Sequence, residues 1–298
     1  MRVLVTGGSG RAGTFVVREM AQAGHEVTHV DRMRPRHDLP GQYLQCDLTD
    51  AGEVYDIFAQ VRPEAVCHLA ANPSPFGFPR QQTFVGNVES TYLVMQAAGD
   101  SGNVQRFVYA SSEMATGWLT TSALPRRFPF DESDRVTTPN AYALSKYLGE
   151  VIADSLSVRY PEMPFVSLRI NNVIVPPTEH DPGTYSWLAD RRAGFPTNGS
   201  GNFWSYIDAR DVATAFRAAV EGSTTAHEVY LIAARDTCLA MPTRDALQAR
   251  HGDSILARVS SELGEYDSAF DCGKIARDLG WHAAHSWRDA DVQLGVPE

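Results

Sequence analysis

The feature that most constrains the fold is an alternation of short apolar runs with longer helical runs between residue 2 and about residue 170. Strands that alternate with helices in this way pair in parallel, because each helix carries the chain back across the sheet. The runs that we interpret as strands are residues 2–6, 26–30, 42–46, 65–69, 106–110 and 165–170. The sequence therefore predicts an α/β chain built on a doubly wound parallel sheet.

The first of these strands runs into a glycine-rich turn, Gly7-Gly8-Ser9-Gly10-Arg11-Ala12-Gly13, and an apolar helical pattern follows it. Glycines three residues apart permit a tight turn, a close approach of the backbone to a pyrophosphate and a helix packed near its strand. The N-terminus of that helix offers unpaired N–H groups to phosphate charge. Since the turn joins a strand to a helix, we predict a dinucleotide-binding site here.

An acidic residue ends the second predicted strand. Asp31 stands eighteen residues beyond Gly13, where a carboxylate can accept both ribose hydroxyls of NAD and repel the 2′-phosphate of NADP. The positive charge of Arg32, the next residue, could reduce that repulsion. NAD is therefore favoured, but NADP is not excluded. After the third strand, Asp47 could contact an adenine, but either Asp47 or Asp50 could instead cap the next helix.

Small and polar residues follow the strands at 65–69 and 106–110. The first strand ends beside Ala70 and Ala71, which leave room for a ligand, and the second delivers Ser111-Ser112-Glu113. Reacting groups and ligands gather at this carboxyl edge of a parallel sheet. The loop at 72–79 is rich in proline and aromatic residues, and it is either a rim of the substrate site or a stiffened connection.

A helical run that begins after Pro139 and Asn140 carries Tyr142 and Lys146 four residues apart. That spacing places both side chains on one helix face. A free phenol has a pKa near ~10, and a neighbouring ammonium can lower it by roughly 1–3 units. Such a phenol can exchange a proton with an alcohol or a carbonyl. The spacing also arises by chance on amphipathic helices, so the pair indicates an acid/base site only together with the other motifs.

Charge and cysteine usage exclude other classes of function. The chain carries 36 Asp and Glu against 26 Lys and Arg, whereas a protein that tracks phosphate backbones usually has the opposite balance, so we expect no nucleic-acid partner. The four cysteines lie far apart without metal-ligand spacing, which indicates free thiols in a reducing compartment and no metal site. The chain shows no leader and no long apolar run, so we expect a cytoplasmic protein without a membrane partner.

At 298 residues the chain is long enough for a large domain and a smaller lobe. The regular alternation fails from about Asn171, where proline and glycine punctuate the sequence. We therefore predict a dinucleotide-binding domain at residues 1–170, to which 203–234 returns. A smaller mixed substrate-binding lobe is expected from 171–202 and 235–298. A helix at 274–281 is expected to dock that end of the chain.

These motifs in this order resemble the extended short-chain dehydrogenases/reductases and, more narrowly, the NAD-dependent epimerase/dehydratase family, which includes nucleotide-sugar epimerases. The resemblance covers nearly the whole chain and implies a Rossmann-type fold and a carbohydrate-type substrate. It rests on residues 6–13, Cys46-Asp47-Leu48, residues 68–71, Ala110-Ser111-Ser112, Glu132, residues 142–146, residues 168–172 and residues 206–213.

The resemblance also implies roles for single residues. Tyr142 would be the catalytic acid/base, Lys146 would lower its pKa and hold the nicotinamide ribose, and Ser112 would hydrogen-bond the reacting oxygen. The resemblance also implies cofactor contacts from Tyr142 and Lys146 themselves and from Gly7, Gly10, Arg11, Ala12, Gly13, Asp31, Asp47, Leu48, Leu69, Ala70, Ala71, Asn87 and Ser111. The Asn87 amide suits helix packing almost equally well, and the Ser111 hydroxyl is expected to pack inward.

One departure from the family pattern bears on the substrate. In nucleotide-sugar members, an Arg that clamps the diphosphate usually stands where this chain has Trp204. An indole lacks the charged fork that suits a diphosphate, although it can stack on a sugar ring. We therefore expect a free or small carbohydrate derivative rather than a nucleotide sugar, unless Arg191, Arg192 or Arg210 takes over.

A second departure concerns the residues after the catalytic serine. Dehydratase relatives usually carry two acids there, whereas here Met114 follows Glu113, which argues against net dehydration. Trp187 suits either the substrate site or the core. Substrate contacts are expected from Ser112, Glu113, Asn172, Trp204 and Arg210.

Three functions are compatible with these patterns. The first is an NAD-dependent oxidoreductase that transfers hydride at a secondary hydroxyl of a sugar or sugar acid. The second is a nucleotide-sugar epimerase that retains tightly bound NAD, and the third is a non-catalytic NAD-binding sensor. Relatives often dimerise through the helix that carries the catalytic tyrosine, and Tyr147, Val151 and Ile152 would allow such a homodimer.

Overall fold

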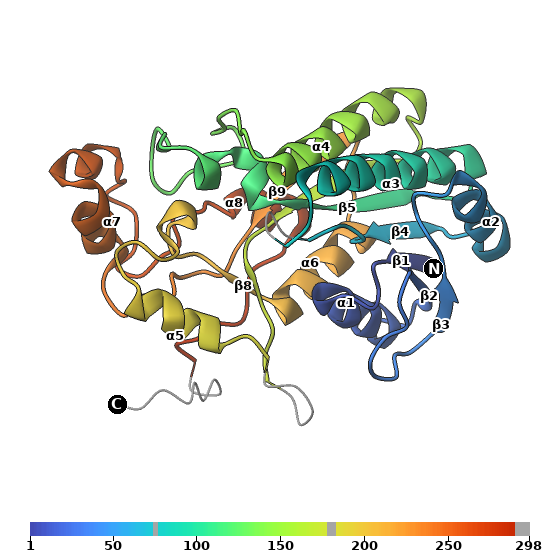
Figure 1. Ribbon diagram of the computed structural model, residues 1–298, viewed down its shortest axis with the longest axis horizontal. Helices are drawn as coiled ribbons and strands as arrows, with labels where there is room; N and C mark the ends of the chain where they lie inside the picture. The colour runs from blue at the N-terminus through green and yellow to red at the C-terminus, as the bar shows by residue number, and fades with distance from the viewer. Residues whose placement is uncertain (74–76, 178–182, 290–298) are drawn as a thin grey trace.

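The computed structural model describes residues 1–73, 77–177 and 183–289. A seven-stranded sheet forms its centre, with every pair of neighbouring strands parallel (Figure 1). In spatial order the strands are β3 (Gln42–Gln45), β2 (Glu26–Asp31), β1 (Arg2–Thr6), β4 (Ala65–His68), β5 (Arg106–Ser112), β6 (Phe165–Ile170) and β9 (His227–Ile232). The predicted doubly wound sheet is confirmed.

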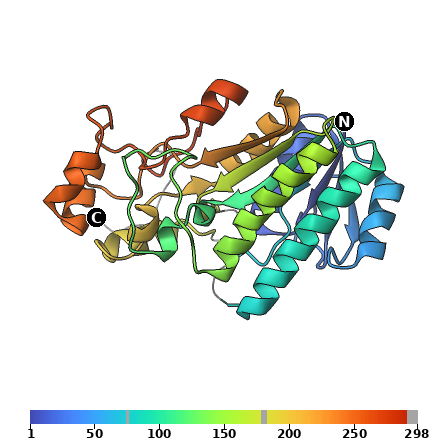
Figure 2. The ribbon, with the colours of Figure 1, turned by 90° about the horizontal axis from the view of Figure 1, so that it is seen from above.

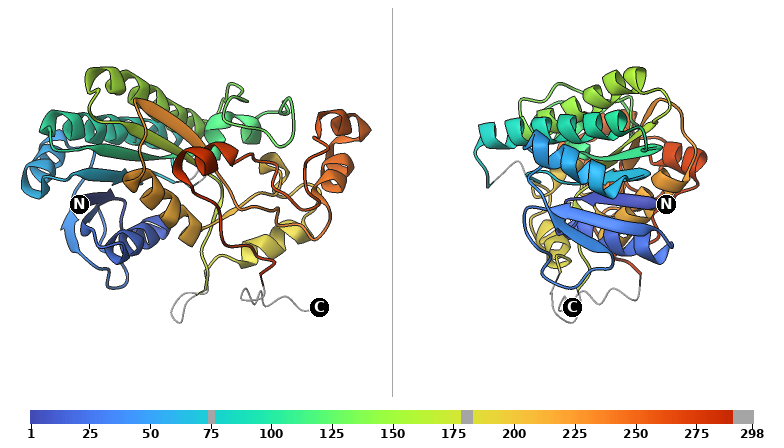
Figure 3. Two further views of the ribbon diagram at one scale, coloured as in Figure 1. Left: turned by 180° about the vertical axis from the view of Figure 1, so that it is seen from behind. Right: turned by 90° about the vertical axis from the view of Figure 1, so that its right-hand side faces the viewer.

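Helices cover both faces of the sheet, as the end-on and reverse views in Figure 3 show. One layer is α1 (Arg11–Gln22) and α6 (Ala209–Glu221), and the other is α2 (Ala51–Val61), α3 (Arg80–Ser101) and α4 (Ala141–Arg159). Each face of the sheet packs against its own hydrophobic core, and successive β1 side chains enter these two cores in turn because strand side chains alternate between faces. Val3 and Val5 belong to the core under α1 and α6, whereas Leu4 belongs to the core under the other helices.

The strand order reverses next to β1, and this reversal positions the site. From β1 the chain moves outward to β2 and β3, then returns to β4 on the other side of β1 and continues to β5 and β6. The connections after β1 and β4 therefore leave opposite faces of the sheet. In open α/β sheets, the crevice at the carboxyl ends of such strands is where ligands bind.

A smaller lobe adjoins one end of the sheet (Figure 2). It contains α5 (Ser186–Ala193), α7 (Thr243–His251) and a pair of short strands, β7 (Val173–Ile174) and β8 (Ile207–Asp208). Its core also takes Phe128 and Phe130 from the connection between β5 and α4. The Phe128 and Phe130 backbones form bridges to Val259 and Phe270, so this connection packs with the lobe although it precedes residue 170.

A helix lies where the sequence predicted one near residues 274–281: α8 (Gly273–Leu279) packs beside β9. Lys274 Nζ donates to the Val229 carbonyl at 2.9 Å, and Gly280 ends the helix with a left-handed φ of +67°. Trp281 then enters the core beneath α1 and α6. Among the described residues, no helix has both the length and the apolar character that crossing a membrane requires.

Candidate active site

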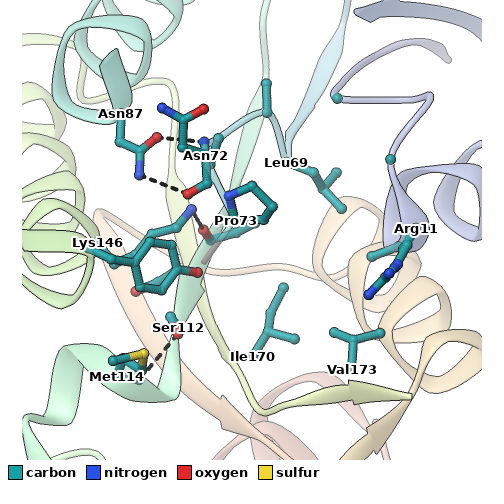
Figure 4. A pocket seen from close by; sticks show the side chains of 18 of the residues that line it. Arg11, Leu69, Asn72, Pro73, Asn87, Ser112, Met114, Lys146, Ile170 and Val173 are labelled. Carbon is teal, nitrogen blue, oxygen red and sulfur yellow. Dashed lines mark hydrogen bonds between the residues drawn. The ribbon is translucent and has the colours of Figure 1, made fainter. Parts of the chain in front are cut away.

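A cavity of 1030 Å³ opens at the carboxyl ends of the sheet strands and extends toward the smaller lobe (Figure 4). Its walls come from the turn after β1, the ends of β2, β4, β5 and β6, the start of α4, and residues of α5 and the 3₁₀ turn η3 (Ser200–Asn202). Segments from both parts of the molecule therefore meet around one space, which is large enough for more than a drug-sized ligand.

The glycine turn forms one end of this cavity and is built so that only glycine fits. Gly7 has a left-handed φ of +71°, and a Cβ there would lie 2.6 Å from the Ala70 backbone nitrogen. A Cβ on Gly13 would lie 2.0 Å from the Gly7 carbonyl oxygen. Because α1 begins directly after Gly10 without a side-chain cap, its first N–H groups are available to an anion. The turn fits a pyrophosphate.

Two aspartates line the cavity beyond the turn. The Asp31 carboxylate accepts backbone hydrogen bonds from Ser9 and Met33, each at 3.2 Å, which hold it at the end of β2. Asp47 accepts two bonds from Thr49, and these hydrogen bonds lower the pKa of its carboxyl below the usual value. Asp50 is the residue that caps α2, so the structure leaves Asp47 at the cavity wall.

Ser112, Tyr142 and Lys146 meet where β5 and α4 face the cavity. Asn140 caps α4 by accepting from the backbone nitrogens of Tyr142 and Ala143, at 2.9 and 3.1 Å. The Ser112 hydroxyl accepts from the Met114 backbone nitrogen at 3.2 Å. Lys146 Nζ donates to the Ala110 carbonyl at 2.7 Å and lies 5.9 Å from the centre of the Tyr142 ring.

The protonation equilibria of this group differ from the sequence-based expectation. Burial raises the pKa of Tyr142 to about 12, although the polar influence of the Ser112 hydroxyl opposes the rise. Burial also lowers the pKa of Lys146 to about 7. The expected lowering of the Tyr142 pKa by Lys146 is therefore not found in this structure, because desolvation favours the neutral form of both groups.

The loop after β4 is tied to the helices by Asn87 (Figure 4). Asn87 Oδ1 accepts from the Asn72 nitrogen at 2.7 Å, and its Nδ2 donates to the Asn72 carbonyl at 3.3 Å and to Ser145 Oγ at 3.1 Å. Asn87 thus lines the cavity while its amide holds the loop. Of the proline-rich loop, Asn72 and Pro73 line the cavity, and residues 74–76 lie outside the described part of the chain.

The other predicted cofactor contacts also lie at the cavity. The Ser111 hydroxyl turns inward and donates to Glu150 Oε1 at 2.5 Å. Cavity-lining residues that the sequence predicted as cofactor contacts include Arg11, Ala12, Leu48, Leu69, Ala70, Ala71 and Ser111.

Two predicted substrate contacts lie elsewhere. As far as the described residues define the cavity, its lining does not include Trp204 or Arg210. Trp204 is 0% exposed and packs on the Phe195 ring at a centroid distance of 5.4 Å, so its indole cannot stack on a substrate. Arg210 instead pairs with Asp208, with 2.9 Å between Nε and Oδ1. The structure therefore places neither side chain at the cavity, because the smaller lobe's core holds Trp204 and a local ion pair holds Arg210.

Other residues of the smaller lobe line the cavity in their place. Arg191 and Trp187 reach it from α5, and the Arg11 guanidinium lies 5.1 Å from the Trp187 ring centre. Asn171 and Asn202 also line it. From the sequence, Arg191 was one of three arginines that could replace the missing diphosphate-binding Arg at position 204. Nothing in the sequence singled out Asn202.

Comparison with known proteins agrees with this architecture. A model of the NAD dependent epimerase/dehydratase family matches residues 3–233. UDP-glucose 4-epimerase of Lactobacillus helveticus is 30% identical over 159 residues, which cover 51% of this chain and 46% of that protein. The matched region therefore spans about half the length of this curated relative.

Solved structures show the same fold over nearly the whole chain. UDP-glucose 4-epimerase of Thermotoga maritima, with UDP-glucose, has a TM-score of 0.70 at 21% identity, covering 96% of this chain and 94% of that one. UDP-glucose 4-epimerase of Bifidobacterium longum, in complex with NAD⁺ and UDP, has a TM-score of 0.72 at 20% identity, with coverages of 98% and 96%. At these identities the likeness shows the fold alone.

Proposed function

This chain belongs to the NAD-dependent epimerase/dehydratase family, and we propose that it is an enzyme that uses NAD to transfer hydride at a secondary hydroxyl or carbonyl of a carbohydrate-type substrate. One observation carries the proposal. Ser112, Tyr142 and Lys146 come together on the wall of a cavity that begins at a glycine turn fitted to a pyrophosphate. A proton-transfer group and a dinucleotide site then share one space, which the reaction requires.

NAD would lie along the strand ends from β2 to β5. The glycine turn would hold its pyrophosphate, Asp31 its adenosine ribose and Asp47 its adenine, with Lys146 at the nicotinamide ribose. When bound, the nicotinamide ring supplies the group that accepts and donates hydride. The Asp31 carboxylate supports NAD over NADP, since it would repel a 2′-phosphate.

Residues of this chain would carry out the proton transfer. Tyr142 would exchange the proton of the substrate: its phenolate would take the proton of the hydroxyl during oxidation, and the phenol so formed would return it during reduction. The Ser112 hydroxyl, which lines the same cavity, would hydrogen-bond that oxygen and fix it beside Tyr142. The Ala110 carbonyl accepts from Lys146 Nζ at 2.7 Å and keeps the amine in place.

A nucleotide sugar is the substrate class that we favour within this function, with epimerisation as the net reaction. The argument against a diphosphate depended on Trp204, which is buried outside the cavity. Arg191 lines the cavity and offers a guanidinium that suits a diphosphate. UDP-glucose 4-epimerases among the relatives support the same class. Net oxidation of a free sugar, and an NAD-binding sensor without turnover, are the alternatives.

The deciding experiment uses the purified protein and a Tyr142→Phe variant. NMR would follow UDP-glucose and UDP-galactose, absorbance at 340 nm would follow NADH with free sugars and uronates, and mass spectrometry would detect NAD carried through purification. Epimerisation without net NADH is expected, and the variant should lose it by at least about 10²-fold while still binding NAD. NADH release with a free sugar would instead favour the dehydrogenase, and equal silence of both proteins would favour the sensor.

A further inference from the structure

The cavity wall holds a cluster of polar side chains that the proposed reaction does not use. Glu113 follows Ser112 in the 3₁₀ turn η1 (Glu113–Thr116), Asn171 follows β6, and Asn202 ends η3. All three side chains are more than nine-tenths buried, and all three line the cavity. Three segments distant in sequence therefore bring polar groups to the wall beside the catalytic serine.

Asn202 joins this cluster together. Its Nδ2 donates to Glu113 Oε1 at 3.3 Å, to Asn171 Oδ1 at 3.2 Å and to the Ser205 carbonyl at 3.0 Å. These bonds orient the amide and leave its oxygen directed away from the same partners. The cluster is thus held in one arrangement before any ligand arrives.

The opposite atom of each side chain has no partner. Glu113 Oε2, Asn171 Nδ2 and Asn202 Oδ1 are buried without a hydrogen bond among the described residues, and so is Nδ2 of the neighbouring Asn172. Buried polar groups in folded proteins are nearly always paired, so several unpaired ones on one cavity wall point to a ligand. The set offers at least two amide donors and one amide acceptor.

The carboxyl of Glu113, when protonated, adds an O–H donor to the amide donors. Burial raises its pKa to about 8, against the opposing influences of Arg191, the Asn202 hydrogen bond and the Asn172 backbone N–H. At neutral pH the group is a carboxylic acid, and since Oε1 accepts from Asn202, its proton belongs on Oε2. Glu113 then presents an O–H donor beside Ser112.

We propose that Glu113, Asn171 and Asn202 bind neighbouring ring hydroxyls of an uncharged sugar, next to Ser112 and Tyr142. A sugar hydroxyl can both donate and accept a hydrogen bond. Adjacent hydroxyls could therefore accept from the unpaired donors of this cluster and donate to the unpaired Asn202 oxygen. A sugar carboxylate would instead face that amide oxygen without a proton to give it. This inference rests on the proposed function and specifies which part of the substrate the site recognises.

The first test compares Asn202→Ala and Asn171→Ala with Asn198→Ala, a matched change at an exposed residue of the same lobe. KM for UDP-glucose and Kd for NAD would be measured for each, with circular dichroism as a check on folding. We expect KM to rise roughly tenfold or more in the first two variants, with NAD affinity unchanged. Asn198→Ala should match the wild type.

The second test uses Glu113→Gln, whose amide keeps an acceptor for Asn202 and a donor toward the cavity. As pH rises through about 8, the wild-type carboxyl loses its proton, so KM of the wild type should rise more steeply than KM of the glutamine variant. Arg191, Tyr142 and Lys146 also face this space, but they are common to both proteins, so the difference between the two profiles belongs to Glu113.

A third measurement needs no variant. Deoxy analogues of UDP-glucose, each lacking one ring hydroxyl, should include at least one that binds wild type roughly tenfold more weakly than the parent sugar. Turnover with a KM that neither the variants nor the deoxy analogues change would overturn the subsite alone. Tighter binding of UDP-glucuronate than of UDP-glucose would also overturn it. If wild type binds no sugar nucleotide at all, the proposed substrate class and this subsite are both refuted.

Discussion

Replacing Glu150 by alanine is expected to destabilise the fold by about 3–5 kcal/mol, because a buried guanidinium loses its partner. Arg169 Nε and Nη2 each lie 2.9 Å from the Glu150 carboxylate. The Arg169 and Glu150 side chains are only 6% and 4% exposed. Ser111 Oγ donates a third bond to the same carboxylate, so the substitution also removes the acceptor beneath the end of β5.

The magnitude depends on the arginine remaining charged. Burial alone would lower the pKa of Arg169, but the hydrogen bonds and charge of Glu150 raise it above its usual value. After the substitution, the contact of Nη1 with the Glu132 carbonyl remains, which offsets only part of the desolvation. Replacing both partners by methionine removes the buried charge, so the double variant should recover most of the lost stability.

Urea unfolding followed by tryptophan fluorescence would measure these changes in the free energy of unfolding. Glu221→Ala is the control, because Glu221 and Arg217 form an exposed pair with side-chain exposures of 40% and 43%. Its expected cost is about 0.5 kcal/mol. A loss below about 1 kcal/mol for Glu150→Ala, or a double variant no more stable than the single one, would refute the reasoning.

Three further predictions follow from other parts of the structure. Gly13→Ala should abolish NAD binding measured by calorimetry, because its Cβ would lie 2.0 Å from the Gly7 carbonyl oxygen; unchanged affinity would contradict the pyrophosphate site. Burial lowers the pKa of His68 to about 3 from 6.5, so only the unfolded chain takes up its proton between these values and stability falls as pH falls. Between pH 6.5 and 4.5, His68→Asn should lose about 2 kcal/mol less than wild type in urea unfolding, and parallel losses would count against this. Val151 is 40% exposed on α4, and light scattering should show a dimer that Val151→Lys converts to a monomer, whereas a monomeric wild type would exclude that interface.

Most of the sheet could be predicted because its signals are local. The apolar runs, the turn residues between them and the glycine spacing at Gly7, Gly10 and Gly13 depend only on neighbours in sequence. The position of the cavity then follows from connectivity, since strand order reverses beside β1. Tyr142 and Lys146 could be placed on one face of a helix for the same reason, because helical spacing is a local property.

The sequence by itself therefore determined the doubly wound sheet, the glycine turn and the residues offered at the strand ends. Only the tertiary structure decided that Trp204 enters the smaller lobe's core while Arg191 and Asn202 reach the cavity. An aromatic or charged side chain in a loop has no periodic pattern, and its surroundings come from segments far away in sequence. Tertiary burial likewise decided the pKa values of Tyr142 and Lys146, because desolvation depends on everything packed around a group and not on its spacing along a helix.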